Sequence, residues 1–417
     1  MKFNKSSQLL LVSAASLLAA VLITACGTAT TDFVYVSSAK AAGANSYGEI
    51  NVYEINGVSG SMRQILSSPY PSGGRNPVAE AVSSDYANLY VVNQDDNTIV
   101  QFMIGSDGKL YPQNTVNTPG IFPLAVAVSG TNLFVVDTYQ PLPACSTADP
   151  CPGSVGVFPL QPATTGANPT PSGAPGPTPL TNTATGADYW PLILPSNPKH
   201  IITPTAVNVL KSGADLFVTA YDASVTPNAG YVFGFSIGSS GALTALNGGV
   251  PFAAGVHPSA VASATQTSGT YVYVTDSVNG NVLGYSFSSG LLTSLSGSPY
   301  PAGNLPAAIV ADPAYPYVYV ANSTDGNIVA YSISSSGVLT RIGAYTAGIQ
   351  PVAIGIDPST NHFLFTANFT PDGVNGTVTG FELSATAGTL VDTQNSPYPS
   401  TAQPTAVAAV PHGSTTH

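Results

Sequence analysis

Two histidines and an arginine stand just upstream of prolines that open short apolar strands. His257 directly precedes a proline, and His200 and Arg75 each lie within four residues of one. An imidazole can act as a general base near neutral pH, and a guanidinium binds carboxylate or phosphate groups. Together they could carry a hydrolytic site. Equally, His257 could be an exposed residue ahead of a strand, and Arg75 could be solvated beside Gly73 and Gly74.

Acidic and amide side chains form a second polar series. The carboxylates that follow strands are Asp95, Asp96, Asp137, Asp222, Asp276, Asp325 and Asp372, and the amides that precede strands are Asn76, Gln350 and Gln403. From these we take Asn76, Asp95, Asp222, Asp276, Asp325, Gln350 and Gln403 as ligand-binding candidates. A ring of carboxylates could bind Ca²⁺, but Asp also caps hairpin turns locally, and no calcium-loop motif is present. We therefore expect neither a metal nor another cofactor.

Other motifs give weaker signals. Ser37-x-x-Lys40 and Ser196-x-x-Lys199 match an acyl-enzyme pattern, but neither opens a helix, and GxSxG, HExxH and CxxC are missing from the sequence. Tyrosines lie between prolines in "SSPYP", "GSPYP" and "NSPYP". They could stack on a sugar or peptide, but their equivalent repeat positions favour packing over the seams between repeats.

The positions of all these residues are set by an internal repeat. A proline followed by small apolar residues recurs as "PVAEAV", "PLAVAV", "PTAVNV", "PSAVAS", "PAAIVA", "PVAIGI" and "PTAVAA", starting at Pro77, Pro123, Pro204, Pro258, Pro306, Pro351 and Pro404. Most intervals lie between 45 and 54 residues and one is 81. This is the length of a four-stranded propeller blade.

Each anchor proline except the last is followed by two further strands. Second strands read "LYVVN", "LFVVD", "LFVTA", "YVYVTD", "YVYVAN" and "FLFTAN", and third strands such as "GNVLGYSF" and "GNIVAYSI" follow a turn. A weaker fourth strand is indicated by segments such as "GVLTRI". The pattern is β throughout, with no sustained helical period.

The two ends complete one another. Residues 33–66 supply later strands of a blade but no anchored first strand, and the C-terminal "PTAVAAV" supplies a first strand with nothing after it. We predict an all-β fold, a seven-bladed β-propeller over residues 33–410, closed by pairing of the C-terminal strand with the N-terminal blade. Loops entering first strands, and loops between second and third strands, then converge at one channel mouth, which gathers the polar candidates.

The repeats "YVYVAN…GNIVAYSI" and "YVYVTD…GNVLGYSF" resemble the YVTN-type repeat and the lactonase-like seven-bladed family that includes 6-phosphogluconolactonase. The resemblance implies lactone hydrolysis at the channel mouth. Members commonly carry Arg or His just after the anchor proline. Here those positions are Val78, Leu124, Thr205, Ser259, Ala307, Val352 and Thr405. No active-site residue is therefore carried over by motif.

The N-terminus reads as an export signal. Two lysines precede an apolar run that ends in "ITAC", followed by Gly27, which looks like a lipoprotein lipobox. We predict a signal peptide at 1–25, lipidation of Cys26, a tether at 26–32 and anchorage at the cell envelope, facing the periplasm or the surface, with the outer membrane expected. A transmembrane helix is the alternative, but it would not explain the cysteine.

The remaining features concern charge, cysteines and an insertion. Without the leader, seven basic residues face twenty acidic ones, a formal charge of −13, which argues against a nucleic-acid partner. Cys145 and Cys151 then remain as a pair, and we predict a disulfide. Residues 161–191 form a Pro/Gly/Thr-rich insertion, a spacer or a lid, and residues 411–417 form a tail.

Two functions follow from this sequence. The first is a monomeric binding or scaffolding module at the envelope, with a protein, peptide or glycan partner and the membrane contacted through Cys26. The alternative is a lactone hydrolase that has diverged from the family it resembles, with His257, Arg75 and His200 at the mouth. Hydrolysis needs a positioned base and a group that stabilises the oxyanion.

Overall fold

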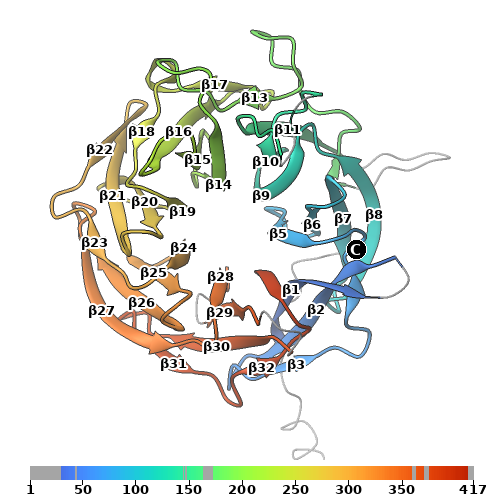
Figure 1. Cartoon of the computed structure of the whole chain (residues 1–417). Helices are drawn as coiled ribbons and strands as arrows, with labels where there is room; N and C mark the ends of the chain where they lie inside the picture. The colour runs from blue at the N-terminus through green and yellow to red at the C-terminus, as the bar shows by residue number, and fades with distance from the viewer. Residues whose placement is uncertain are drawn as a thin grey trace, which may run out of the picture.

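The computed structural model describes residues 30–42, 45–143, 145, 148–162, 172–358, 363–370 and 375–411. Seven small antiparallel sheets are arranged in a ring (Figure 1). The one helical element among these residues is a single 3₁₀ turn, η1 (Asn247–Gly249). The predicted seven-bladed β-propeller is therefore confirmed. Within the same ranges, no helix has both the length and the apolar character needed to cross a membrane.

The blades are numbered here in chain order from the sheet that contains the first strand. Blade 1 contains β1 (Thr30–Ala42), β2 (Tyr47–Asn56), β3 (Met62–Gln64), β4 (Tyr70–Pro71) and β33 (Pro404–Pro411), and blade 2 contains β5 (Pro77–Val82), β6 (Asn88–Asn93), β7 (Thr98–Ile104) and β8 (Leu110–Asn117). Blade 3 contains β9 (Ile121–Ser129), β10 (Asn132–Tyr139), β11 (Ser154–Gln161), β12 (Ala174–Pro175) and β13 (Trp190–Pro191). Blade 4 contains β14 (Ile202–Val209), β15 (Asp215–Asp222), β16 (Ala229–Ile237), β17 (Leu243–Ala245) and β18 (Phe252–Ala253).

Blade 5 contains β19 (Pro258–Gln266), β20 (Gly269–Asp276), β21 (Asn281–Ser288), β22 (Leu291–Ser294) and β23 (Tyr300–Pro301). Blade 6 contains β24 (Pro306–Ala311), β25 (Tyr317–Asn322), β26 (Asn327–Ile333) and β27 (Leu339–Thr346), and blade 7 contains β28 (Pro351–Ile356), β29 (Phe363–Asn368), β30 (Thr377–Leu383), β31 (Leu390–Asp392) and β32 (Tyr398–Pro399). The proline-anchored strands are innermost in the ring (Figure 1).

The ring is closed by its two ends, as the sequence predicts. The C-terminal strand β33 pairs antiparallel with β1, with Val36 opposite Val407 and Tyr35 opposite Ala408. Figure 1 shows the red C-terminal strand beside the blue N-terminal strands. This pairing gives blade 1 its innermost strand and removes the open sheet edges that an unclosed array would expose.

The core is divided among the seams between blades. Each of the seven seams holds its own buried cluster of Val, Ile, Leu, Phe and Tyr side chains from the facing sheets. Tyr300 and Tyr398 of the repeated SPYP segments are buried in such clusters, and Tyr70 packs against a third. Packing over the seams, the favoured interpretation of these tyrosines, is therefore what the structure shows. The middle strands are buried on both faces, which explains their continuous apolar character.

Residues 172–191 of the insertion are packed against the ring. They supply β12 and β13, the outer edge of blade 3. The Tyr90 hydroxyl of blade 2 donates to the Gly173 carbonyl at 2.6 Å. Trp190 is buried, and its Nε1–H donates to the Leu243 carbonyl of blade 4 at 2.8 Å. The insertion thus links three consecutive blades, and a flexible spacer is wrong for these residues.

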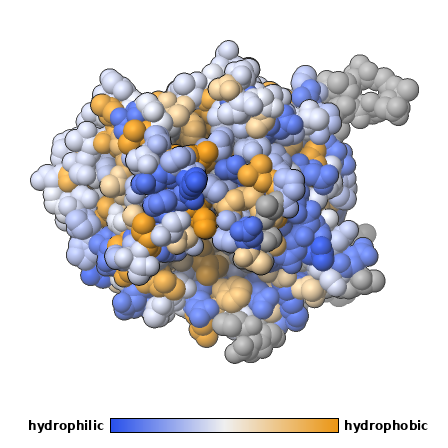
Figure 2. All heavy atoms as spheres, turned by 45° about the horizontal axis from the view of Figure 1, so that its top comes forward, coloured by the Kyte–Doolittle hydropathy of each residue, from blue (hydrophilic) through white to orange (hydrophobic). Residues whose placement is uncertain are grey.

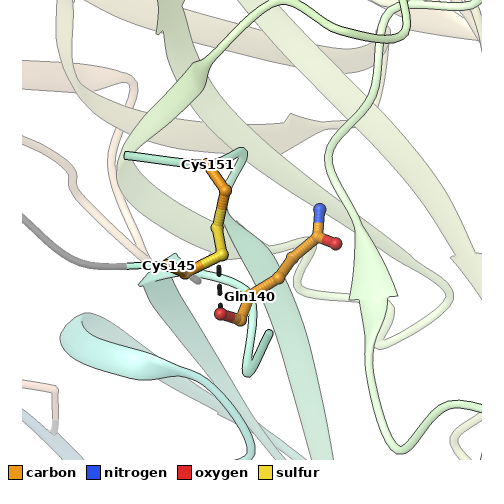
Figure 3. The surroundings of a disulfide bond; sticks show 3 residues. All are labelled: Gln140, Cys145 and Cys151. Carbon is orange, nitrogen blue, oxygen red and sulfur yellow. Dashed lines mark hydrogen bonds between the residues drawn. A yellow bond between two sulfur atoms is a disulfide. The ribbon is translucent and has the colours of Figure 1, made fainter. Parts of the chain in front are cut away.

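Cys145 and Cys151 form the predicted disulfide, with their Cα atoms 5.5 Å apart. Figure 3 shows the bond beside the Gln140 carbonyl oxygen, which lies 3.8 Å from Cys151 Sγ. The bridge closes the loop that follows β10 and precedes β11. On the face shown in Figure 2, hydrophobic residues are dispersed among polar ones and do not gather in one broad patch.

Candidate active site at the channel mouth

Five of the seven blades share one polar contact where the chain enters the first strand. The anchor proline pairs with an Asn or Asp at the end of the second strand: Pro77 with Asn93, Pro123 with Asp137, Pro258 with Asp276, Pro306 with Asn322 and Pro351 with Asn368. A glycine three residues before the proline packs on this side chain, and in blade 6 an added Cβ at Gly303 would lie 2.7 Å from Asn322 Cγ. The contact is structural and joins the two loops at the mouth.

Blades 1 and 4 break this rule at both positions. In blade 1, Pro404 pairs with Ser38, and the residue three places before the proline is Thr401. In blade 4, the anchor proline Pro204 pairs with Ala220, and the residue three places before it is Ile201. The β14–β15 ladder then continues for two more pairs, Thr203 with Tyr221 and Ile202 with Asp222. Because successive side chains of a strand point to opposite faces, Tyr221 and Asp222 leave the extended end on its two sides.

His200 and Asp222 form a histidine–carboxylate pair at this extended end. His200 Nδ1 lies 2.6 Å from Asp222 Oδ2, and Asp222 Oδ1 accepts the Ser224 N–H at 2.9 Å. The Asp222 side chain is 2% exposed, whereas that of His200 is 30% exposed. A carboxylate on Nδ1 favours the tautomer with Nδ1 protonated, which leaves Nε2 as a proton acceptor.

His257 lies on the other side of the same strand end. Its ring stacks on Tyr221, with centroids 4.1 Å apart and an interplanar angle of 31°. Its Nδ1 lies 3.1 Å from Ser277 Oγ, and its backbone N–H donates to Asp276 Oδ1 at 3.1 Å. The aromatic ring of Tyr221 and the hydroxyl of Ser277 therefore orient the imidazole. Among the described residues, Nε2 of His257 has no hydrogen-bond partner.

Arg75 is not part of this arrangement. It belongs to the loop entering blade 2, where its Nε donates to Asp96 Oδ1 at 2.6 Å and its backbone N–H to Asp96 Oδ2 at 2.7 Å. The guanidinium lowers the pKa of Asp96, chiefly through this hydrogen bond. The structure brings His200 to Asp222 and His257 to Tyr221, but it gives Arg75 a carboxylate of its own blade.

The other sequence candidates bond mostly within their own loops. Asn76 Nδ2 donates to Asp95 Oδ1 at 3.1 Å, and the Asp325 carboxylate accepts both the backbone and side-chain N–H groups of Asn304 at 2.8 Å. The carbonyls of Gln350 and Gln403 accept backbone N–H groups from Phe369 and Ala39. Asp372 lies outside the described residues.

Asp137 of blade 3 is a buried acid without a charged partner. It is fully buried and accepts the Gly120 N–H at 3.0 Å, but its Oδ1 has no hydrogen-bond partner. Burial raises its pKa to about 7. In the described ranges no group of three or more His, Cys, Asp or Glu side chains could hold a metal ion.

Sequence reasoning missed Tyr221 and Ser277, the two residues that hold His257. Tyr221 belongs to the second-strand segment "LFVTAYD" of blade 4, and the matching segment of blade 3 is "LFVVD". The Asp therefore comes two residues later in blade 4 than in blade 3. This extra length, together with the replacement of glycine by Ile201, was a readable signal of an extended hairpin. Ser277 carried no signal, because serine also follows Asn322 at the matching place in blade 6.

The fold and this site define a seven-bladed β-propeller with a histidine–carboxylate pair at the channel mouth. Residues 231–409 match the family described as "Lactonase, 7-bladed beta-propeller". This match, with the ring of seven sheets, confirms the resemblance to the lactonase-like propellers.

Solved structures share the fold over most of the chain. A periplasmic gluconolactonase from Pseudomonas aeruginosa is 18% identical, with a TM-score of 0.66, covering 91% of this chain and 99% of its own. A protein assigned provisionally as a 6-phosphogluconolactonase, from Bacteroides fragilis, is 17% identical with a TM-score of 0.65, covering 92% and 99%. At these identities the likeness extends to the fold alone. No curated protein matches the chain.

Proposed function

We propose that this protein is a lactone hydrolase whose site lies at the channel mouth of blade 4, with His200 as the general base. The observation that carries the proposal is the His200–Asp222 pair, placed where the structural contact shared by five other blades is replaced. Departures from a repeat that each blade could otherwise satisfy mark functional sites. The family match covers residues 231–409, which do not include His200 and Asp222, and it supports the class of chemistry alone.

The arrangement suits attack of water on a lactone carbonyl. His200 Nε2 accepts a proton as the water oxygen bonds to the carbonyl carbon, and Asp222 holds Nδ1–H and stabilises the imidazolium. When the tetrahedral intermediate collapses, the ring C–O bond breaks and His200 returns the proton to the departing alkoxide. The product is the hydroxy acid. His257 stacks on Tyr221, on the opposite side of the strand end from His200 and Asp222, and is given no role in this step.

The charges at the mouth favour a neutral lactone over a phosphorylated one. A phosphate group is normally bound by Arg or Lys in charge-assisted hydrogen bonds. Arg75 is paired with Asp96, and the chain as a whole carries 9 Lys and Arg against 20 Asp and Glu. In the salt bridge found at the His200 site, the partner of the Asp222 carboxylate is the His200 imidazole. We therefore propose an uncharged lactone as the substrate class.

A panel of lactones tests this proposal. The purified protein is offered uncharged five- and six-membered lactones and a phosphorylated sugar lactone, with ring opening followed by proton release. We expect turnover of one or more uncharged lactones and a phosphorylated substrate with a much lower kcat/KM. Failure to hydrolyse any lactone above the rate in buffer would refute the proposal, and a preference for the phosphorylated lactone would overturn the choice of substrate class.

A second function, binding of a protein or peptide, is favoured by one observation. Three aliphatic side chains of the mouth loops in blades 5 to 7, Val278, Leu305 and Ile349, are exposed. Their loops touch: Gly303 donates to the Gly280 carbonyl, and Gly348 donates to that of Gly326. A photocrosslinker at position 305 that captures one defined envelope protein, together with no turnover of lactones, would favour binding.

Location and assembly remain proposals. We propose that Cys26, outside the described residues, carries the lipid that anchors a monomer at the cell envelope. Metabolic labelling with a radioactive or clickable fatty acid tests this, with Cys26→Ser as the control. Incorporation into the wild type and its loss in the variant is the expected result, and equal labelling of both would contradict it.

A further inference from the structure

Glu80 is the only charged residue on the seven described first strands. It lies on β5, three residues after the anchor proline, where the other six strands carry an aliphatic residue: Val126, Val207, Val261, Ile309, Ile354 and Val407. A carboxyl group at an apolar position of a propeller seam costs free energy unless it is neutral or paired. Its contacts therefore indicate what it does.

The Glu80 carboxyl group bridges to the closing sheet, blade 1. The Ser37 hydroxyl of β1 donates to Glu80 Oε2 at 2.5 Å, and Ser37 is fully buried. The backbone of Ala408, on the closing strand β33, acts on the same carboxyl group and lowers its pKa against the larger effect of burial. A hydrogen bond also joins β33 to β5, because the Thr405 hydroxyl donates to the Pro77 carbonyl at 2.7 Å.

Among the described residues, no salt bridge includes the Glu80 carboxyl group. Its Oε1 is buried and has no hydrogen-bond partner. The titratable group that faces it from β1 is Tyr35, whose pKa is raised by burial, so this phenol stays neutral. From β2, Glu49 accepts the Thr401 hydroxyl at 2.9 Å instead of contacting Glu80. An ionised carboxylate here would lack a cation, and one of its oxygens would lack any donor.

We propose that Glu80 is a neutral-acid latch that fastens the closing strand β33 to blade 2, and that ionisation of this carboxyl group loosens the closure of the ring. The contacts with Ser37 and Ala408 favour the ionised form, but the cost of burying its charge is larger, so the closed ring stabilises the neutral acid. This role is independent of the proposed hydrolase, because Glu80 lies in the seam between blades 1 and 2, away from the His200 site on blade 4.

The sign of the pH effect follows from burial. Desolvation raises the pKa of Glu80 to about 8, from 4.5 for the exposed group. A carboxyl group whose pKa is raised in the folded state contributes its full stabilisation of the folded protein at pH values below its pKa in the unfolded chain. This contribution is lost as the pH rises through the pKa of the group in the folded protein. The loss should therefore extend from about pH 4.5 to about pH 8.

The test compares the wild type with Glu80→Gln, which keeps the size and removes the ionisation. Urea unfolding is measured from pH 6 to pH 9. Between these two pH values, the unfolding equilibrium constant of the wild type should rise by about a hundredfold more than that of Glu80→Gln. Amide exchange, corrected for intrinsic rates, should show protection of residues 406–410 falling over the same range while that of β14 falls less.

Two controls isolate the latch. Glu382→Gln, at an exposed carboxyl group on β30, should keep the wild-type pH dependence. Asp137→Asn, introduced into both backgrounds, removes the other buried acid whose pKa is raised into this range. Equal pH dependence of the wild type and Glu80→Gln would overturn the proposal. If Glu80→Gln does not fold, amide exchange of the wild type between pH 6 and pH 9 tests the proposal. An equal loss of protection in β33 and β14 would then overturn the proposed latch.

Discussion

Blades 4 and 6 place different groups at the same point of the channel mouth. In blade 6, Gly303 packs on Asn322, and Asn304 bonds Asp325. In blade 4, Ile201 stands at the position of Gly303 and Ala220 at that of Asn322. The strand pairing continues to Tyr221 and Asp222. The blade 6 carboxylate of Asp325 accepts N–H groups of its neighbour Asn304, whereas the blade 4 carboxylate of Asp222 contacts an imidazole ring.

The difference separates two uses of the same residue types. An Asp in the regular blades accepts backbone N–H groups of its own loops and so holds the strand entrance, as Asp276 does for Val256 and His257. Asp222 accepts a histidine ring as well as the Ser224 N–H. We infer that the extended hairpin frees a carboxylate from a structural role and gives it a positioning role.

The largest effect is expected for Asp222→Asn. The amide would favour the wrong tautomer of His200 and could not stabilise an imidazolium, so kcat for lactone hydrolysis should fall by roughly a hundredfold to ten-thousandfold. Steady-state kinetics across pH measure this loss. A kcat within a factor of two of wild type would show that the blade 4 pair does not act as proposed.

The seam beside blade 4 should also be sensitive. Trp190→Ala removes a buried indole and its hydrogen bond to Leu243, so the free energy of unfolding should fall by about 3–5 kcal/mol. Urea denaturation measures this change. Val250→Ala, at a 53% exposed side chain near the same edge, is the control and should change it little. Equal effects would mean that the insertion is not packed as described.

Blade 6 should respond in stability rather than chemistry. In Gly303→Ala the new Cβ would lie 2.6 Å from Asp325 Oδ2 and 2.7 Å from Asn322 Cγ, which should cost about 1–3 kcal/mol of unfolding free energy. Gly238→Ala is the control, because its Cβ would meet Ala242 O at 3.3 Å. Matching denaturation midpoints for the two variants would show that the glycine contact does not hold the strand entrance.

The smallest effect is expected for Arg75→Ala in blade 2. Removing the guanidinium should let the pKa of Asp96 rise toward its ordinary value, because the hydrogen bond from Arg75 is the main cause of its depression. The exposed ion pair should contribute little to stability. Titration of the Asp96 carboxyl carbon by NMR measures the shift, and an unchanged pKa would contradict the pairing.

The fold could be predicted from the sequence because its signals are repeated. Seven anchor prolines, alternating strands and incomplete ends define the ring and its closure, and the pair Cys145–Cys151 is close in sequence. The site was less predictable. His200 and His257 stood out as departures from the repeat. Their partners, however, depend on how far the β14–β15 hairpin extends and on which of its two faces each side chain lies. The partner of Arg75 was not predictable either, because two adjacent carboxylates, Asp95 and Asp96, follow the same strand and the carboxylate that the guanidinium contacts is that of Asp96.

The role of His200 is the central claim, and its replacement tests it most directly. The initial rate of hydrolysis of the best uncharged lactone is compared for the wild type, His200→Ala and Thr324→Ala, a variant in the matching loop of blade 6, with folding checked by circular dichroism. We predict that His200→Ala loses at least about a hundredfold in rate while Thr324→Ala does not. A folded His200→Ala variant with the wild-type rate would contradict the claim.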